Sequence, residues 1–411
     1  MDSYNYLIIG GGIAGTTAAE TIRGKEPEAT IAIVTDEPHR LYSKVMLSKP
    51  SFFLGQTPFD AIWLRKEEFY SEKRITRLFG RQAVKLDSAA KTVTLADGAT
   101  VGFGKLLLAF GTYARPWPVP GADLPGVHYV RTAEDGRAII EAVKTAKKGI
   151  VIGSGFIGFE MCEMLRLAGL EVTSLIREKY FWEPFFDETS GRMIEGVLEK
   201  GGVRIVRNTL AHHVVGKDRV EGVALSDGTV LPCDLVIAAV GAYPPLDWLK
   251  GSGLETNRGV IANEFLETTL PDVWVAGDCA EFNDIVLGER TCVGTWVNAQ
   301  MQGRQAALNM TGAKQPYRLV SFYTAKGFEL NVGSVGSPWP LPGRDFVLRG
   351  VPSDGWYERF VFKGPKLVGA TIVGRTQDVG TITRLIDKGI DLTARKAELA
   401  DPQVDLKTLT A

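Results

Sequence analysis

The stretch YNYLIIGGGIAGTTAAETIR, residues 4–23, decides how the chain begins to fold. Its apolar run predicts a strand, and Gly10, Gly12 and Gly15 follow at GxGxxG spacing before small residues that suit a tightly packed helix. In such a turn the first glycine permits the tight bend, the second lets a pyrophosphate approach the backbone, and the third allows close packing of the helix. Because the helix N-terminus then faces the phosphates, the stretch predicts a strand–turn–helix unit that can bind a dinucleotide.

The next predicted strand ends on acidic residues. It reads TIAIVTDE, residues 30–37, and closes with Asp36 and Glu37. A carboxylate at this place in a dinucleotide-binding unit accepts hydrogen bonds from ribose hydroxyls. Either residue can take that role.

The same construction recurs in GIVIGSGFIGFEMCEMLRLAGLEVTSLIREK, residues 149–179, with Gly153, Gly155 and Gly158 as its glycines. One such turn alone is weak evidence, because tight strand-to-helix turns that bind nothing share the spacing. Two copies about 140 residues apart, each followed by a helix and a strand, predict two separate dinucleotide sites.

Composition excludes several classes of protein. The 411 residues carry 47 Lys and Arg against 48 Asp and Glu, so there is no global field to attract nucleic acid or anionic lipid. No apolar run approaches the roughly 20 residues that cross a bilayer, so no membrane association is expected. The opening MDSYNYLIIG enters a strand almost at once, which makes a leader peptide unexpected and the cytoplasm the default location.

The cysteines and histidines show no pattern typical of metal or dithiol sites. Cys162, Cys233, Cys279 and Cys292 lie at least 13 positions apart and form no CxxC. The four histidines include no pair one helical turn apart. We therefore expect buried free thiols and no metal.

The order of patterns predicts the domain organisation. Residues 116–244 indicate one inserted α/β domain, and 295–312 indicate a helix. From about residue 321, strands alternate and end in a helix, which predicts a C-terminal α+β domain. The predicted fold class is α/β, with two Rossmann-like dinucleotide-binding domains, one discontinuous over 1–115 and 245–320 and one at 116–244, plus the C-terminal domain at 321–411.

These motifs, in this order, resemble a known family. The two GxGxxG turns, with LLLAFG at 106–111, VIAAVG at 236–241 and DVWVAGD at 272–278, are similar to the two-dinucleotide-binding flavoproteins that include glutathione reductase, rubredoxin and ferredoxin reductases, and apoptosis-inducing factors. LYSKVMLSK at 41–49 resembles the flavin-side segment of rubredoxin and ferredoxin reductases. TWVNAQMQG at 295–303 resembles the tryptophan-bearing segment of ferredoxin reductases that serve oxygenases. The resemblance spans essentially the whole chain.

The resemblance implies FAD and NAD(P)H as cofactors. The residues that it implies in binding them are Gly10, Gly12, Ile13, Ala14, Gly15, Asp36, Glu37, Lys44, Lys49, Ala83, Arg115, Gly153, Gly155, Gly158, Arg177, Gly241, Gly277, Asp278, Trp296 and Tyr323. Among them, Ala83 is implied to meet adenine through its backbone, Arg115 to lie near the FAD phosphates, and Asp278 to contact the ribityl chain. Trp296 and Tyr323 are implied to border the isoalloxazine.

The chain also departs from the family pattern. Phe110 stands where a Thr is common, Val45 replaces a Pro, and Lys44 stands where many members have Arg.

Lys49 and Glu160 match family positions that form an ion pair beside the flavin. On general grounds Lys49 could be a solvated surface lysine, and Glu160 could simply favour a helix N-terminus. The resemblance implies instead that Lys49 favours the negative charge of the reduced flavin and that Glu160 holds Lys49 and can orient the carboxamide. They are the expected catalytic residues, and neither is expected to act as a general base.

Thiol chemistry is not expected. Disulfide reductases of this family need a dithiol beside the flavin, and its peroxidases and oxidases need a cysteine just before LYSK, whereas the first cysteine here is Cys162. What remains is hydride transfer to the flavin and electron transfer to an acceptor. The expected acceptor is a small iron–sulfur carrier, rubredoxin or ferredoxin, and the chain is expected to be a monomer or homodimer.

Three other functions stay open: an NAD(P)H oxidase, the flavin module of a larger reductase of nitrite-reductase type, and an apoptosis-inducing-factor-like protein that acts by redox-dependent association. The choice of nicotinamide is also open. In VTSLIREK, Arg177 and Lys179 can bind a 2′-phosphate, whereas Glu178 opposes a phosphate or serves NADH. The balance leans slightly to NADPH.

A basic rim is expected to receive an acidic carrier. Its candidates are Lys44, Arg304, Arg318 and Lys326, which flank the segments implied to surround the isoalloxazine.

Overall fold

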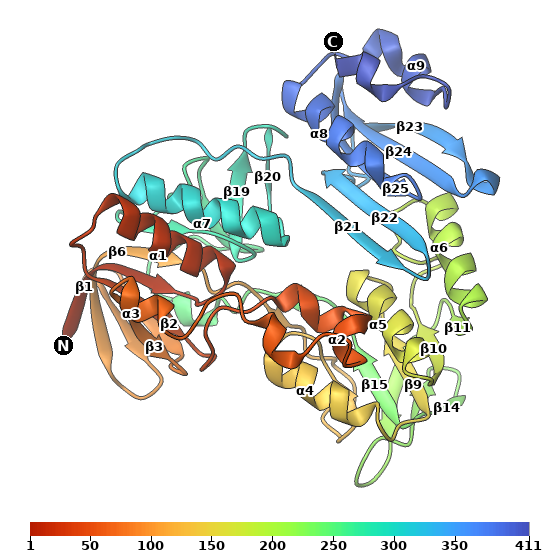
Figure 1. The fold of residues 1–411 in the computed structure, drawn as a ribbon, viewed down its shortest axis with the longest axis horizontal. Helices are drawn as coiled ribbons and strands as arrows, with labels where there is room; N and C mark the ends of the chain where they lie inside the picture. Colours follow the sequence, from red (N-terminus) through yellow and green to blue (C-terminus); the bar gives the residue numbers. More distant parts are fainter. Residues whose placement is uncertain (411) are drawn as a thin grey trace. The chain divides into compact units, whose positions relative to one another are not determined.

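The structure is a computed structural model that describes residues 1–410, and these divide into two compact units. Unit 1 comprises Met1–Ser43, Asp60–Tyr113 and Ala242–Ser321. Unit 2 comprises Lys44–Phe59, Ala114–Gly241 and the described residues from Phe322 on. Figure 1 labels the helices and strands of both.

Unit 1 is built on a mixed sheet with the strand order β3-β2-β1-β6-β5-β4, in which β18 also pairs with β6. Its strands are β1 (Asp2–Ile9), β2 (Ile31–Thr35), β3 (Ile75–Phe79), β4 (Ala83–Asp87), β5 (Thr92–Leu95), β6 (Thr100–Leu108) and β18 (Val273–Val275). Because β1 pairs in parallel with β2 and β6, and β6 with β18, the carboxyl ends of these strands meet at one edge. A small second sheet has the order β17 (Val260–Ala262), β19 (Ala280–Asp284) and β20 (Glu289–Thr291).

Two helices lie side by side against this sheet (Figure 1). They are α1 (Ile13–Lys25) and α7 (Trp296–Met310), and the short α3 (Phe69–Glu72) lies near β3. Gly303 of α7 permits the close approach, since a Cβ there would stand 2.2 Å from the carbonyl oxygen of Ala14. The predicted strand–turn–helix at the N-terminus and the predicted helix over 295–312 are confirmed.

Unit 2 contains a second parallel sheet, with the order β11-β10-β9-β15-β8. Its strands are β8 (Val127–His128), β9 (Lys148–Ile152), β10 (Glu171–Leu175), β11 (Val203–Val206) and β15 (Leu235–Ala238). The accompanying helices are α4 (Ala133–Ala142), α5 (Phe156–Leu167) and α6 (Glu188–Lys200). A small antiparallel sheet follows the order β12 (Ala211–Val215), β13 (Gly222–Leu225) and β14 (Val230–Pro232).

The C-terminal part of unit 2 is an antiparallel sheet with the order β21-β22-β25-β24-β23. Its strands are β21 (Phe322–Gly327), β22 (Leu330–Gly336), β23 (Arg344–Val351), β24 (Trp356–Lys363) and β25 (Lys366–Val373). Helix α8 (Val379–Lys388) packs on β22 and β25, and α9 (Lys396–Ala400) packs on β23. The predicted fold class, two Rossmann-like domains plus an α+β region, is confirmed.

The compact units do not follow the predicted domain boundaries. Residues 44–59, predicted to belong with 1–115, lie in unit 2 and contain α2 (Pro50–Phe53). Leu47 and Phe52 are buried there against Gly136 of α4. Local sequence patterns do not reveal this contact, because its partners are about 90 positions apart. Short strands β7 (Tyr113–Ala114) and β16 (Ala242–Tyr243) stand at the unit boundaries, and the limits of independently folding domains stay a prediction.

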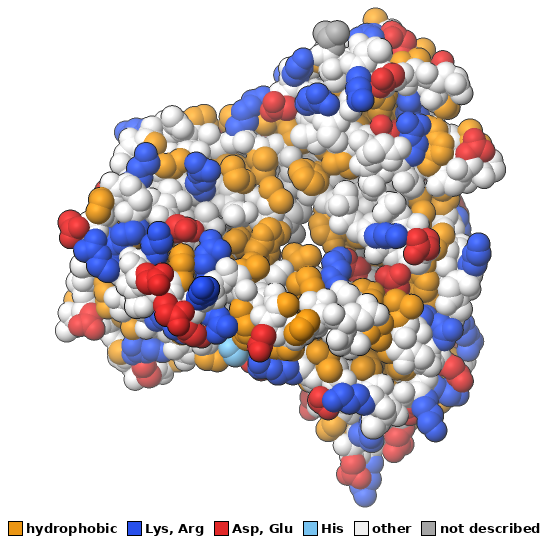
Figure 2. Space-filling view, viewed as in Figure 1, with side chains coloured by type: hydrophobic (Ala, Val, Ile, Leu, Met, Phe, Trp, Pro, Cys, Tyr) orange, Lys and Arg blue, Asp and Glu red, His pale blue; other side chains and the backbone are white. Residues whose placement is uncertain are grey.

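Within residues 1–410, no helix combines the length and the apolar character that a membrane span requires. Figure 2 shows acidic and basic side chains interspersed over the visible face, in keeping with the formal net charge of -1.

Candidate functional site

The turn between β1 and α1 has the shape of a phosphate-binding turn. Gly10 has φ +120°, and a Cβ on it would stand 2.1 Å from the carbonyl oxygen of Ala109. A Cβ on Gly15 would stand 2.0 Å from the carbonyl oxygen of Gly10. At Gly12, the N-cap of α1, no atom of the described residues lies within 4 Å of an added Cβ. The first and third glycines are therefore needed by the fold, whereas the middle one leaves an open cradle that fits a pyrophosphate.

The acidic residues after β2 lie in the same unit as this turn and are bound by tyrosines. The hydroxyl of Tyr113 donates to Asp36, and that of Tyr42 donates to Glu37. An ionised carboxylate offers about four acceptor positions, so each can still accept from a ribose hydroxyl. Ala83 begins β4 and is buried. The ribose and adenine roles of these residues stay predictions.

The loop after β18 meets the first turns of α1 and α7. Gly277 has φ +83°, and an added Cβ would lie 3.3 Å from Cβ of Ala14. Its N–H donates to Oε1 of Gln302 at 2.8 Å, and Gln302 is fully buried on α7. Asp278 follows, with the hydroxyl of Thr112 at 3.5 Å from its carboxylate. The structure thus brings Ala14, Gly277 and Asp278 together, as the resemblance implies for a cofactor site.

Trp296 is the first residue of α7 and is partly exposed. Thr295 caps the helix, since its hydroxyl accepts from the N–H of Asn298 at 3.4 Å. Trp296 therefore lies at the capped start of α7, in the same helix as Ala299, whose Cβ lies 3.6 Å from a Cβ added to Gly277. Its contact with the isoalloxazine stays a prediction.

The second glycine turn, in unit 2, repeats the construction of the first. A Cβ on Gly153, which has φ +107°, would stand 2.5 Å from the carbonyl oxygen of Ala239, and one on Gly158 would stand 2.2 Å from that of Gly153. Gly155 has no atom of the described residues within 4 Å of an added Cβ. This cradle fits the pyrophosphate of a second dinucleotide.

Two predicted cofactor residues of unit 2, Arg115 and Gly241, are joined by a backbone hydrogen bond. The N–H of Arg115 donates to the carbonyl oxygen of Gly241 at 2.9 Å, and Gly241 has φ +106°. Lys44, also in this unit, donates through Nζ to the carbonyl oxygen of Arg131 at 3.3 Å. The predicted contacts of Arg115 and Lys44 with FAD stay predictions.

Glu160 of α5 stands at the centre of a polar cluster in unit 2. Its side chain is 2% exposed, and a carboxylate so buried requires partners. Lys49 Nζ lies 2.5 Å from Oε1, the hydroxyl of Ser48 donates to Oε2, and the hydroxyl of Tyr323 donates to Oε1 at 3.3 Å. The ion pair between Lys49 and Glu160 that the resemblance implies is present in the structure.

Tyr323 enters this cluster from β21. Burial, and secondarily the negative charge of Glu160, raise the pKa of Tyr323 well above its usual value of 10. Tyr323 therefore keeps its proton and donates to Glu160 throughout the neutral range. Its ring also contacts Phe156, the first residue of α5, with ring centroids 4.2 Å apart. Its predicted place beside the isoalloxazine stays a prediction.

The loop after β10 places Glu178, rather than Arg177, at the glycine turn. The hydroxyl of Ser154, inside the turn, donates to Oε2 of Glu178 at 3.3 Å. Arg177 is 76% exposed, and its guanidinium lies 3.0 Å from Oε1 of Glu178. The residue of this loop that contacts the glycine turn is thus the acidic Glu178, and the choice between NADH and NADPH stays a prediction.

The cysteines are unsuited to redox catalysis. All four are free, and Cys162, Cys233 and Cys279 are buried, as predicted, while Cys292 is partly buried. Burial raises the pKa of Cys162, Cys233 and Cys279 to about 12 and that of Cys292 to about 11. Because the thiolate is the reactive form, none of these residues is a nucleophile near neutral pH. Among residues 1–410, no group of three or more His, Cys, Asp or Glu is arranged to hold a metal ion.

Several residues of the site were not identified from the sequence. They are Ser48, Tyr42, Tyr113, Glu178 as a neighbour of the glycine turn, and Gln302. Ser48 and Gln302 lie inside the LYSKVMLSK and TWVNAQMQG segments, so their position in those segments was the available signal. No sequence pattern indicated the hydrogen bonds of Tyr42 to Glu37 and of Tyr113 to Asp36, because only the folded chain brings these side chains together.

Two open phosphate turns on separate units, a buried lysine–glutamate pair and unreactive thiols define an oxidoreductase that works with two dinucleotides. Residues 4–303 match the family described as pyridine nucleotide-disulphide oxidoreductase, and 327–410 match the reductase C-terminal family. The chain belongs to the pyridine nucleotide-disulphide oxidoreductase family. It is an NAD(P)H-dependent flavoprotein oxidoreductase with FAD and NAD(P)H as cofactors, as predicted.

Characterised relatives extend over nearly the whole chain. A ferredoxin reductase subunit of 5,5'-dehydrodivanillate O-demethylase from a Sphingobium species is 31% identical, covering 100% of this chain and 99% of its own. The NAD(P)H nitrite reductase of Bacillus subtilis is 30% identical over 96% of this chain, but the chain spans only 48% of that relative.

Solved structures show the same fold. A ferredoxin reductase from Rhodopseudomonas palustris has a TM-score of 0.90 at 31% identity, covering 100% of both chains. Putidaredoxin reductase in its covalent complex with putidaredoxin has a TM-score of 0.92 at 26% identity, covering 100% of this chain and 98% of that one.

Proposed function

We propose that this chain transfers a hydride from a nicotinamide to FAD and passes the electrons to a small iron–sulfur carrier of the ferredoxin or rubredoxin type. The observation that carries the proposal is the pair of open cradles at Gly12 and Gly155, one in each unit. The ferredoxin reductases and the putidaredoxin complex among the relatives support a carrier protein as the acceptor. FAD supplies the change from two-electron to one-electron chemistry when bound.

The chain's own residues bind, orient and stabilise charge. The glycine turns hold the two pyrophosphates at helix N-termini, which fixes both cofactors before the reaction. Lys49 supplies a positive charge that favours the reduced flavin. Glu160 keeps Lys49 in one position, and Ser48 and Tyr323 in turn orient the carboxylate of Glu160 by donating to it.

The nicotinamide that the site favours is NADH. A carboxylate beside the glycine turn accepts from a ribose 2′-hydroxyl and repels a 2′-phosphate. Glu178 has this position through its contact with Ser154, and Arg177 is paired with the same carboxylate.

Glu178→Gln is expected to raise the KM for NADH about tenfold and to leave the KM for NADPH unchanged or lower, because a charge-assisted hydrogen bond is lost while a repulsion is relieved. Steady-state kinetics with both nicotinamides measure this. Glu171→Gln, at the other end of β10, is the matched control and should not alter either KM. A rise in the KM for NADPH alone in Arg177→Ala would instead assign Arg177 to a 2′-phosphate and contradict the preference for NADH.

The acceptor is tested by NADH oxidation with a two-iron ferredoxin, putidaredoxin, a rubredoxin or oxygen as the acceptor. Fast reduction of a carrier, with slow oxygen reduction, is the expected result. Fast oxygen reduction would identify an oxidase. Slow turnover with a long-lived reduced complex would identify an association protein of the apoptosis-inducing-factor type.

A second candidate is the flavin module of a nitrite reductase. The specific observation in its favour is that this chain matches only half of the Bacillus subtilis enzyme. Co-purification with a separate nitrite-reducing chain, and nitrite-dependent NADH oxidation only in its presence, would favour this candidate over a carrier reductase.

The cytoplasm is the proposed location. All four thiols are free, and free thiols persist in reducing compartments.

A further inference from the structure

A cluster of buried charges lies in the C-terminal sheet of unit 2 and includes none of the residues assigned to the cofactors. Its centre is Glu358 of β24, which is 0% exposed. Arg349, directly opposite on β23, is 2% exposed, whereas the residue opposite Glu358 on β25 is the apolar Ile372. Arg375 and Asp378 complete the cluster from the turn before α8, where the Arg375 guanidinium lies 3.2 Å from the carboxylate of Asp378.

In the described part of the chain, the carboxyl group of Glu358 lacks a hydrogen-bond donor. Neither of its oxygens accepts a hydrogen bond from a described residue. The group within hydrogen-bonding reach is another carboxyl, that of Asp378. Two ionised carboxylates can only accept, so these two groups can be hydrogen-bonded only if one of them carries a proton. Because a buried carboxylate without a donor is costly, a shared proton accounts for this contact.

Arg349 does not replace that proton, because it holds the C-terminal segment, residues 396–404. Its two Nη atoms donate, at 2.6 to 3.5 Å, to four carbonyl oxygens of the segment, those of Leu399, Asp401, Pro402 and Val404. Its Nε lies 3.5 Å from Oε2 of Glu358 and makes no hydrogen bond to a described residue. An N–H···O bond is usually about 2.7 to 3.2 Å long, so Arg349 is bonded to the segment and not to Glu358.

The surroundings of Glu358 favour its protonated form. Burial first, and then the negative charge of Asp378, raise the pKa of Glu358 to about 8, while the positive charge of Arg349 opposes the shift. The other charged groups of the cluster are Arg375, which is paired with Asp378, and Asp401 of the segment, whose charge acts on Arg349. The proton is therefore held at neutral pH and lost in mildly alkaline solution.

We propose that Glu358 and Asp378 share one proton at neutral pH, and that loss of this proton in alkaline solution loosens the C-terminal segment from Arg349. A hydrogen bond between opposite charges in a buried site is stronger than one to a neutral carbonyl, so ionised Glu358 attracts the guanidinium. Because the guanidinium is rigid, a movement of its Nε toward Glu358 also displaces the Nη atoms that hold the segment. The inference does not depend on the identity of the electron acceptor.

Glu358→Gln tests the shared proton, because glutamine has nearly the shape of the protonated acid and cannot ionise. The raised pKa means that folded wild-type protein binds more protons than unfolded protein between about pH 4.5 and about pH 8. This contribution to stability is present at about pH 5 and is lost as the pH rises through about 8. In thermal unfolding of the holoenzyme, the Tm of Glu358→Gln is expected to match the wild-type Tm at about pH 5 and to exceed it by several degrees at about pH 9.5. A Tm difference that does not change with pH would overturn the shared proton.

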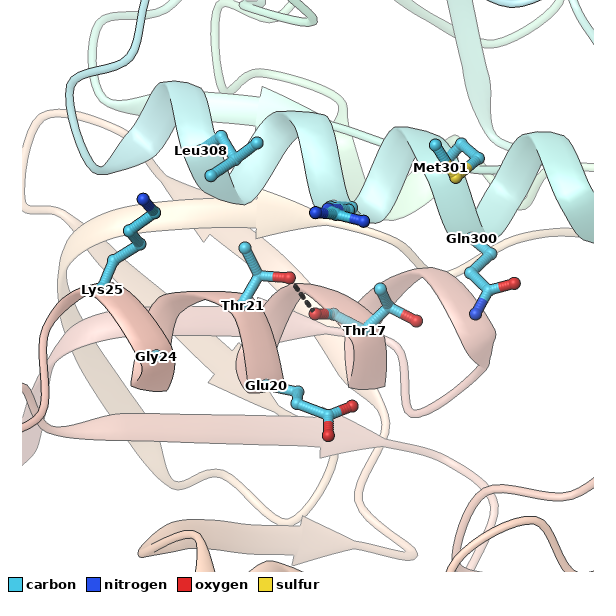
Figure 3. A pocket seen from close by; sticks show the side chains of 9 residues that line it. Thr17, Glu20, Thr21, Gly24, Lys25, Gln300, Met301 and Leu308 are labelled. Atoms are coloured by element: carbon cyan, nitrogen blue, oxygen red, sulfur yellow. Dashed lines mark hydrogen bonds between the residues drawn. The ribbon is translucent and has the colours of Figure 1, made fainter.

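Glu20→Gln is the matched control, since it makes the same change at an exposed carboxylate of unit 1. Figure 3 shows Glu20 on α1, beside the groove between α1 and α7 and pointing away from α7. Its side chain is 40% exposed and pairs with Arg65 at 3.1 Å. The Tm of this variant should differ from the wild-type Tm by the same small amount at both pH values.

Loosening of the segment is measured with trypsin, which cleaves after Lys396. At each pH, the cleavage rate of the wild type is divided by that of Glu358→Gln, which cancels the pH dependence of the protease. The ratio is expected to be about 1 at about pH 7 and at least about fivefold higher at about pH 9.5. Arg349→Lys cannot reach four carbonyls and should be cleaved rapidly at both pH values. Equal cleavage of wild type and Glu358→Gln at the higher pH, or a resistant Arg349→Lys, would overturn the loosening.

Discussion

Gly12→Ala is expected to yield a folded protein that has lost most of its FAD. No atom of the described residues lies within 4 Å of the added Cβ, and Gly12 has φ -72°, which alanine adopts freely. The new methyl group instead occupies the space that a pyrophosphate needs, because the backbone of the middle glycine is where the phosphates approach. We expect the Kd for FAD to rise by at least about 30-fold, or ~2 kcal/mol. Flavin absorbance of the purified protein and titration with added FAD measure this.

Gly155→Ala is the matched variant in unit 2, where the added Cβ also meets no atom of the described residues within 4 Å. It should keep FAD and raise the KM for the nicotinamide instead. Circular dichroism and thermal unfolding establish that both variants are folded. Full FAD content in Gly12→Ala, or loss of FAD in Gly155→Ala, would show that the two cofactors have been assigned to the wrong turns.

Lys49→Met and Glu160→Gln are each expected to slow reduction of the flavin by NADH by about 10²-fold while FAD stays bound. Lys49→Met removes the positive charge that favours the reduced flavin. Glu160→Gln keeps the shape of the side chain but removes the charge that holds Lys49 at 2.5 Å. Rapid mixing of the holoenzyme with NADH under anaerobic conditions measures the rate directly.

Two further variants separate a role in catalysis from a role in folding. Tyr323→Phe removes one donor to Glu160 and is expected to slow the same step only several-fold, in line with one hydrogen bond of about 0.5–1.5 kcal/mol. Glu163 lies one turn further along α5 and accepts a hydrogen bond from the N–H of Phe328, outside the Glu160 cluster. In Glu163→Gln, the flavin should therefore be reduced at the wild-type rate. Wild-type reduction rates in Lys49→Met and Glu160→Gln would contradict the assigned roles.

The cofactor turns show how far sequence reasoning extends. Glycine spacing specifies backbone geometry over six residues, so the bends at Gly10 and Gly153 and the open cradles at Gly12 and Gly155 could be predicted. The Lys49–Glu160 pair was expected only through resemblance to a family. The two residues are 111 positions apart, and no local pattern in the sequence would bring them together.

The partners of these residues could not be predicted, because they depend on packing between distant segments. No sequence pattern marked Ser48, which precedes a short helix, as a site residue. Its hydroxyl donates to Glu160 because residues 44–59 pack against α4 and α5. In the sequence, Glu178 is one of three consecutive charged residues, between Arg177 and Lys179, and nothing distinguishes its role. Only the position of the loop after β10 over the glycine turn separates its role from that of Arg177.

The sequence by itself determined the fold class, the two dinucleotide turns, the family and the absence of a CxxC dithiol, because each depends on residue identity and short spacing. The tertiary structure alone decided which unit holds residues 44–59, which donors surround Glu160, and which charged side chain contacts the second glycine turn. It also brought α1 and α7, about 280 positions apart, into contact at Gly303 and so created the groove between them. The physical reason is the same in each case: a buried charge or a close helix contact is specified by partners that only the folded chain brings together.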